Sequence, residues 1–275
     1  MWRAVGIMFI AMSMIPAGDM AGKMLSGTLG ASPLFVAWSR FALGLVMSLP
    51  FVPRDAWRLL RDPRIWGRGL VMSLGITSIQ MALSTEPLAD VFAAFFIGPG
   101  ISYALSALVL REPARPLRSL LMFVGFAGVL LVVRPGLGGS PGLLWAVLAG
   151  TCYGVFLTAS RALSGLGGPR ALLFTQLAIA TLVLAPIGLT HLPAPSLPVA
   201  GFTLASAAFS MGGNLLLLVA YGRARATILA PLVYFQLIAA VVLGWAVFGD
   251  VPDTFTWAGL VLITGAGLAS ASLRR

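Results

Sequence analysis

The sequence predicts an all-α membrane protein of ten transmembrane helices with almost no soluble domain. Hydrophobic residues make up 59% of the 275 residues and charged residues only 9%, whereas an ordinary soluble domain carries about 25% charged residues. Apolar stretches recur from end to end, and each is roughly 20 residues long, the length that crosses a hydrocarbon core. Lysine and arginine gather in alternate loops, as they do in multi-pass membrane proteins.

Charges, prolines and glycines mark where each apolar stretch ends. The ten spans are expected at 4–24, 33–52, 67–85, 88–110, 117–134, 141–163, 170–190, 198–221, 226–248 and 254–272. The first span follows a basic residue, as the apolar part of a signal peptide does. It is too long for that role and more spans follow, so we interpret it as a retained helix.

The loops are short, which predicts antiparallel packing of neighbouring helices. The longest, 53–66, is rich in arginine and is expected to form an amphipathic turn or short interfacial helix. Counted from a cytoplasmic N-terminus, nearly all of the 18 lysines and arginines fall on one side of the membrane, and the other side receives only Lys23 and Arg134. This asymmetry places both termini in the cytoplasm. The largest cytoplasmic group is Arg54, Arg58, Arg61, Arg64 and Arg68.

The composition argues against several classes of function. The net charge of +10 is explained by membrane topology, and no nucleic-acid-binding motif accompanies it. Cys152 is the only cysteine and His191 the only histidine, so the sequence predicts no disulfide, metal site, cofactor or catalytic centre, and the protein is not expected to be an enzyme. A channel remains an alternative, although no filter-like loop is recognisable.

The two halves of the chain share a pattern. Segments 95–136 and 233–274 each contain an apolar helix, an acidic residue followed shortly by proline, and a second apolar helix with late glycines. The offset of 138 residues that relates Glu112 to Asp250 also relates Lys23 to Arg161. We therefore expect two five-helix repeats, 1–136 and 137–275. Because five is odd, the repeats must be inverted, an architecture typical of secondary transporters.

Several short motifs resemble one family of transporters. The residues that carry the resemblance are Arg111, Glu112 and Pro113; Phe248, Gly249 and Asp250; Trp257, Ala258 and Gly259; Trp38, Ser39, Arg40 and Phe41; and Gly244 with Trp245. Together they resemble the EamA family of the drug/metabolite transporter superfamily, over nearly the whole chain.

The resemblance implies inverted five-helix repeats, a central cavity lined mainly by spans 1, 3, 4, 6, 8 and 9, and transport of small organic metabolites, often export. Two residues depart from the family pattern. Asp250 stands where glutamate is usual, and Gln236 stands where the family often has glutamate before a proline. The acidic and basic residues late in span one also resemble members that import riboflavin or S-adenosylmethionine.

Placing a charged residue within a span costs free energy, so such residues usually face a partner or a polar cavity and are candidates for the transport path. Asp19 and Lys23 are four residues apart and are expected to form an ion pair on one helix face. Arg40 lies at a similar depth in span two, which predicts a gate or a charged subsite, with a static packing contact as the alternative. The candidates for coupling or gating are Asp19 in span one and Glu86, which lies at the outer end of span three.

Polar uncharged residues within spans are candidates for binding substrate, with interhelical hydrogen bonding as the alternative. Those on the expected cavity helices are Gln80, Tyr103, Tyr153, Asn214, Tyr234 and Gln236. Pro16 with Gly18, the run Gly98 to Gly100, and Pro231 are expected to interrupt spans one, four and nine, where they would suit hinges.

The sequence therefore predicts a multi-pass secondary transporter in the inner membrane of a bacterium. Its expected substrate is a small organic metabolite such as an amino acid, moved outward by alternating access, with proton coupling as one hypothesis. Uptake or exchange of a larger metabolite is the alternative. The expected partners are that metabolite, the lipid bilayer and protons, and the chain is expected to be a monomer or a homodimer.

Overall fold

The computed structural model describes residues 2–109, 111, 116–133, 140–223, 233 and 235–272, and within these ranges the regular elements are all helices. The predicted all-α class is confirmed. Up to residue 133 the helices are α1 (Trp2–Lys23), η1 (Met24–Thr28), α2 (Pro33–Ser48), η2 (Leu49–Phe51), α3 (Ala56–Leu59), α4 (Pro63–Leu83), α5 (Leu88–Phe95), α6 (Ile97–Leu108) and α7 (Pro116–Val133). From residue 140 onward they are α8 (Gly142–Ala162), α9 (Pro169–Thr190), α10 (Leu197–Arg223), α12 (Phe235–Leu243), η4 (Gly244–Phe248) and α13 (Thr254–Ser272).

Proline marks the start of several helices. At the first helical position a backbone N–H would have no acceptor within the helix, so the N–H that proline lacks is not missed there. These prolines are Pro33, Pro63, Pro116 and Pro169. The preceding residue caps two of the helices. The Ser32 hydroxyl accepts a hydrogen bond from the backbone of Leu34 at 3.3 Å, and the Asp62 carboxylate accepts one from the backbone of Arg64 at 2.9 Å.

Within the described residues, five helical segments are long and apolar enough to cross a membrane. They are Pro33–Phe51, Leu88–Leu108, Gly142–Ala162, Pro169–Thr190 and Leu197–Ala220. Large apolar side chains such as Phe51, Leu74 and Val261 are at least half exposed, which suits lipid and would be costly in water. The chain is thus a multi-pass membrane protein, whereas the count of ten spans stays a prediction.

The helix breaks differ from those expected. Pro16 lies inside α1, which continues unbroken to Lys23. The fourth span divides at Phe96, between α5 and α6, one turn before Pro99. Proline has no N–H to donate to the carbonyl four residues earlier, which frees the Phe95 carbonyl and loosens the helix at this point. Pro231 lies outside the described residues.

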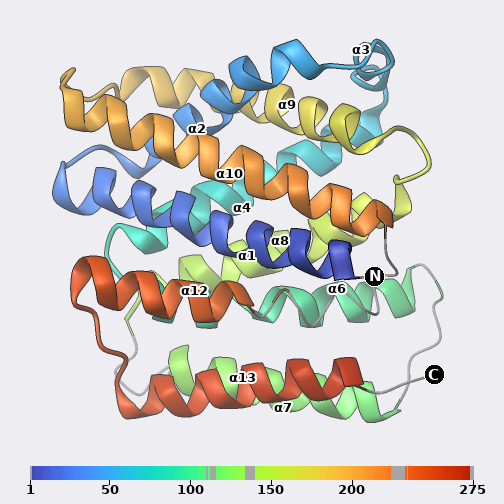
Figure 1. Cartoon of the computed structure of the whole chain (residues 1–275), viewed down its shortest axis with the longest axis vertical. Helices are drawn as coiled ribbons and strands as arrows, with labels where there is room; N and C mark the ends of the chain where they lie inside the picture. The colour runs from blue at the N-terminus through green and yellow to red at the C-terminus, as the bar shows by residue number, and fades with distance from the viewer. Residues whose placement is uncertain are drawn as a thin grey trace.

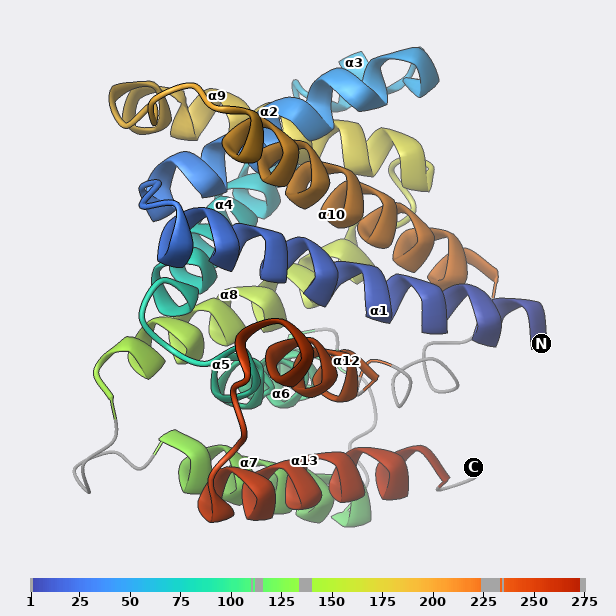
Figure 2. The ribbon, with the colours of Figure 1, turned by 60° about the vertical axis from the view of Figure 1, so that its left-hand side comes forward.

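The helices pair in a reciprocal pattern. α1 packs along α10 and α12, while α8 packs along α4 and α6; α2 packs on α9, and α7 on α13. Figures 1 and 2 both show α7 and α13 side by side at one edge, and the start of α1 at the same end of the bundle as the end of α13. A Cβ at Gly128 would lie 2.9 Å from the Gly259 carbonyl oxygen. These glycines therefore allow α7 and α13 to pack closely.

Candidate functional site

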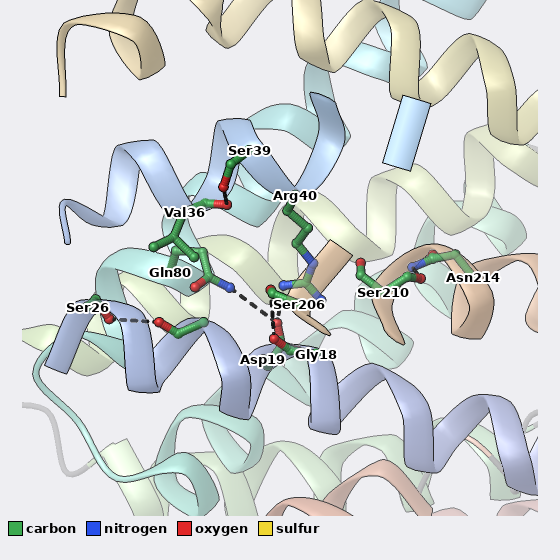
Figure 3. Close-up of polar contacts among 11 residues, drawn as sticks. Gly18, Asp19, Ser26, Val36, Ser39, Arg40, Gln80, Ser206, Ser210 and Asn214 are labelled. Atoms are coloured by element: carbon green, nitrogen blue, oxygen red, sulfur yellow. Dashed lines mark hydrogen bonds and ion pairs between the residues drawn. The ribbon is translucent and has the colours of Figure 1, made fainter. Parts of the chain in front are cut away.

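A buried ionic network joins three helices in the middle of the bundle. The Arg40 guanidinium of α2 forms an ion pair with the Asp19 carboxylate of α1, and both residues are 2% exposed. The fully buried Gln80 of α4 donates from Nε2 to the same carboxylate oxygen at 3.2 Å. Figure 3 shows Arg40 reaching from α2 to Asp19, with Ser210 and Asn214 of α10 on its other side. We call Asp19, Arg40 and Gln80 the buried network.

Small residues on α1 allow this network to form. The Ser206 hydroxyl of α10 donates to the Gly18 carbonyl oxygen at 2.8 Å. A Cβ at Gly18 would lie 3.1 Å from the Ser206 carbonyl oxygen and 3.3 Å from Nη2 of Arg40. A Cβ at Gly22 would lie 2.5 Å from the Gln80 amide oxygen. Larger residues at these positions would therefore push both α10 and the partners of Asp19 away.

A second polar group lies where several helix ends meet. Lys23, the last residue of α1, places Nζ 3.3 Å from an Asp250 carboxylate oxygen and donates to the Glu86 backbone carbonyl at 2.7 Å. The Ser140 hydroxyl, just before α8, donates to the Glu86 carboxylate, and Thr85 donates to the same oxygen at 3.2 Å. We call Lys23, Glu86, Ser140 and Asp250 the end cluster.

Gly249 directs Asp250 into the end cluster. Its φ of 70° lies in the left-handed region, where residues with a side chain are strained. The turn closes η4 as the Gly249 N–H donates to the Trp245 carbonyl at 3.0 Å and the Asp250 N–H to the Gly244 carbonyl at 3.2 Å. The motif that carried the family resemblance is thus a helix cap that aims a carboxylate at α1.

The expected ion pair between Asp19 and Lys23 is wrong. Both side chains find partners elsewhere in the fold: Asp19 binds Arg40 of α2 and Gln80 of α4, and Lys23 binds Asp250 in the turn after η4. The i,i+4 rule describes an isolated helix, in which no such partners compete.

The buried network borders a small cavity of about 30 Å³. Its lining comes from α1, α2, α4, α5, α8, α10 and α12, which are the helices expected from the resemblance with α2 added. The residues are Ile15, Asp19, Arg40, Met72, Gly75, Ile76, Ile79, Phe92, Phe95, Ala149, Tyr153, Asn214 and Gln236. A cavity this size holds water but no metabolite, because pockets for organic ligands measure about 300–1,000 Å³.

A smaller adjoining space, of about 10 Å³, lies between α2, α4, α9 and α10. It shares Arg40, Met72, Ile76 and Asn214 with the larger cavity and adds Gln176 and Ser210. Arg40 and Asn214 therefore contribute to the walls of both spaces.

The structure brings together most of the residues singled out from the sequence. Asp19, Arg40, Tyr153, Asn214 and Gln236 line the cavity, and Gln80 is bonded to the buried network. Three candidates lie elsewhere: Lys23 and Glu86 belong to the end cluster, and the Tyr103 hydroxyl is 3.5 Å from the Ser119 hydroxyl, away from both spaces. Tyr234, like Glu112, Pro113 and Arg134, lies outside the described residues.

Arg68 is a buried residue that the sequence led us to count among the arginines on the cytoplasmic side. It lies in the second turn of α4 and is 1% exposed. Its guanidinium donates to the Ser160 hydroxyl at 2.7 Å, the Leu172 carbonyl at 3.1 Å and the Gln176 amide oxygen at 3.1 Å. The charge count that indicated the topology gave no signal that this arginine points inward.

The arrangement is suited to holding a polar solute. Arginine, glutamine, asparagine and tyrosine supply hydrogen bonds, while Phe92, Phe95 and Met72 supply an apolar wall. The Tyr153 ring lies 4.9 Å from the Phe95 ring, which places an aromatic surface beside the charged residues. Opening of the cavity would be needed before anything larger than water could enter.

Comparison with known proteins supports this interpretation. The model of the EamA-like transporter family matches residues 140–270. A riboflavin transporter of Brucella anthropi is 26% identical and covers 95% of both chains. An S-adenosylmethionine uptake transporter of Rickettsia bellii is 26% identical over 96% of this chain and 92% of its own. The pseudopaline exporter CntI of Pseudomonas aeruginosa is 29% identical over 92% and 90%.

A solved crystal structure shares the fold. Its TM-score is 0.69, with 20% sequence identity, over 98% of this chain and 96% of that chain. The helix arrangement described above is therefore also found in a distant chain of nearly the same extent.

Proposed function

We propose that the chain, whose residues 140–270 match the EamA-like transporter family, is a secondary transporter working by alternating access. In this proposal it moves a small organic metabolite across the inner membrane of a bacterium, through ten spans with both termini in the cytoplasm. The observation that carries the proposal is the buried network of Asp19, Arg40 and Gln80 beside a small cavity lined by both halves of the chain. Buried charges at such a place are typical of a substrate or ion path.

The pairing of helices supports two inverted repeats, 1–136 and 137–275. α1, the first span of the first half, packs on α10 and α12, the third and fourth spans of the second half. In the same way α8, the first span of the second half, packs on α4 and α6 of the first half. Reciprocal contacts of this kind are what a two-fold axis between two like units produces.

The direction of the helices supports the inversion. Lys23, at the end of α1, and Ser140, just before the start of α8, both bond to Glu86. The end of one half's first helix thus lies beside the start of the other's, so the two helices run in opposite directions. Such a pair exposes one central site to each side in turn when the halves rock.

The end cluster suits a gate on the outer side. The Lys23–Asp250 pair joins the first half to the second and is only partly exposed. In this proposal it closes the outer entrance, and Glu86 acts there by holding α8 through Ser140 rather than by contacting substrate. Asp19 would be free to take a proton when the cavity opens and Arg40 moves away.

The expected substrate is an amino acid or a related compound, exported from the cell. Uptake of a larger metabolite is the second candidate, favoured by the printed names of the riboflavin and S-adenosylmethionine carriers among the relatives. The exporter among the relatives is of similar identity. Overall likeness therefore does not distinguish import from export.

Uptake into proteoliposomes tests the proposal. Labelled amino acids, nucleosides, riboflavin and S-adenosylmethionine would be offered to the wild type and to Asp19→Asn, with and without a pH gradient. Saturable uptake of one class, lost in Asp19→Asn, is expected. Flux that does not saturate would instead indicate a channel, and loss of the pH dependence alone in Asp19→Asn would assign Asp19 to proton coupling.

A further inference from the structure

The guanidinium of Arg68 is buried without a carboxylate partner among the described residues. Its three hydrogen-bond acceptors, the Ser160 hydroxyl, the Leu172 carbonyl and the Gln176 amide, are all neutral. The Phe156 ring also lies 4.5 Å from the guanidinium carbon. An arginine is in practice always protonated, so a full positive charge stays uncompensated inside the protein, which is costly.

Arg68 is linked to the cavity through Gln176. The Gln176 amide that accepts from Arg68 lines the smaller space, together with Arg40 and Asn214. Met72, one turn after Arg68 on α4, lines both spaces. A group entering between Arg40 and Gln176 would therefore contact Arg40 and be separated from Arg68 by the Gln176 side chain that Arg68 binds.

Arg40, which lines both spaces, retains donor capacity. One of its terminal nitrogens binds Asp19, but its Nε is buried and has no hydrogen-bond partner within the described ranges. Asp19 neutralises only one of the two arginines. Among the charged residues that line the spaces or bond to their lining, namely Asp19, Arg40 and Arg68, one positive charge is in excess.

On the basis of the proposed function, we infer that the transported metabolite carries an anionic group, a carboxylate, which binds between Arg40 and Arg68 beside Gln176 and Asn214. A carboxylate supplies the missing negative charge and acceptors for the free Arg40 nitrogen. Uncharged or cationic metabolites would leave the excess charge buried. The site thus selects for a carboxylate among metabolites of similar size.

Binding to the purified full-length protein in detergent tests this inference without depending on transport. The probes are succinate, benzoate and N-acetylglycine, each compared with its uncharged amide, and the readout is the shift in thermal unfolding temperature. We expect the carboxylates to stabilise the wild type and the amides not to. Equal stabilisation by the amides, or none by any carboxylate, would overturn the inference.

Variants at Asn214 separate charge from shape. Asn214→Asp places a carboxylate in the lining that Asn214 shares with Arg40, and it should weaken carboxylate binding about tenfold or more, because a buried like charge repels the ligand. Asn214→Leu has the same size without the charge and should weaken binding much less. Arg68→Gln, if it folds, should abolish the carboxylate preference. Unchanged carboxylate binding in Asn214→Asp would contradict the inference.

The transport assay distinguishes the two proposals. Carboxylate binding without saturable uptake of any solute would contradict the proposed function and still support the anion site. Saturable uptake of an uncharged solute that carboxylates do not inhibit would support the transporter and overturn the anion site.

Discussion

Lys23 and Asp250 are 227 positions apart in the chain, yet Nζ of the first lies 3.3 Å from a carboxylate oxygen of the second. The lysine also lies 4.8 Å above the Phe248 ring. The end of α1 is thereby fixed to the turn after η4, and the contact joins the two halves of the chain.

Breaking this pair should favour the state that is open on that side. Asp250→Asn removes a partly exposed ion pair worth about 1 kcal/mol, which would change the ratio of open to closed states about fivefold. Cys152 is the only cysteine, so a Cys152→Ala chain with Ser210→Cys reports access to the smaller space. Labelling of that cysteine by a membrane-impermeant thiol reagent added outside should become faster in Asp250→Asn.

The surface pair Arg64–Asp62 provides the control. Arg64 is 63% exposed and lies 2.7 Å from Asp62 within one helix start, so Asp62→Asn should not change labelling. Equal acceleration in both variants would mean that loss of any ion pair loosens the protein, and the gate would lose its support.

The Asp19–Arg40 pair should behave as a single unit in stability. Asp19→Asn leaves a buried arginine uncompensated and should lower the free energy of unfolding by about 3–5 kcal/mol. Arg40→Met should do the same by leaving Asp19 unpaired. The double variant should be less destabilised than the sum of the two, as measured by thermal unfolding in one detergent. Additive losses would show that the two side chains act independently.

The sequence predicted the helices better than it predicted the partners of charged residues. Apolar length and flanking proline are local signals, and the starts of α2, α4 and α9 follow them within four residues. Partners of buried charges depend on which helices meet, and no local pattern records this. Asp19 and Lys23 were therefore assigned to each other from their spacing, although Asp19 bonds to α2 and Lys23 to the turn after η4.

Arg68 shows a second limit of sequence reasoning. It follows a run of arginines in a loop, and its position five residues after Pro63 suits a side chain at the membrane surface. Only the packing of α4 against α8 and α9 turns it inward. The cavity residues Asn214 and Gln236 were found because a polar residue within an apolar span is rare enough to stand out.

The crossing of α8 with the broken fourth span should not tolerate larger residues. A Cβ at Gly98 would lie 2.6 Å from the Gly150 carbonyl oxygen, and one at Gly154 would lie 2.9 Å from the Ile101 Cβ. Gly98→Val should therefore destabilise the protein by about 1–3 kcal/mol or more through overpacking. Gly67→Ala is the matched control, because nothing lies within 4 Å of its Cβ position, and it should not lower the unfolding temperature.

The proposed topology predicts which loops are reached from outside the cell. Thr28 is the last residue of η1, which directly follows α1, and Ser164 lies in the turn after α8; both residues are exposed. Because α1 and α8 run in opposite directions, cysteines at these two positions should lie on opposite sides of the membrane. In a Cys152→Ala chain in intact cells, Thr28→Cys should react with an impermeant maleimide, and Ser164→Cys should react only after the membrane is permeabilised. Reaction of both from outside would contradict the inverted halves. The reverse result would keep the inversion and instead place both termini outside, which would mean that the distribution of arginines had been misinterpreted.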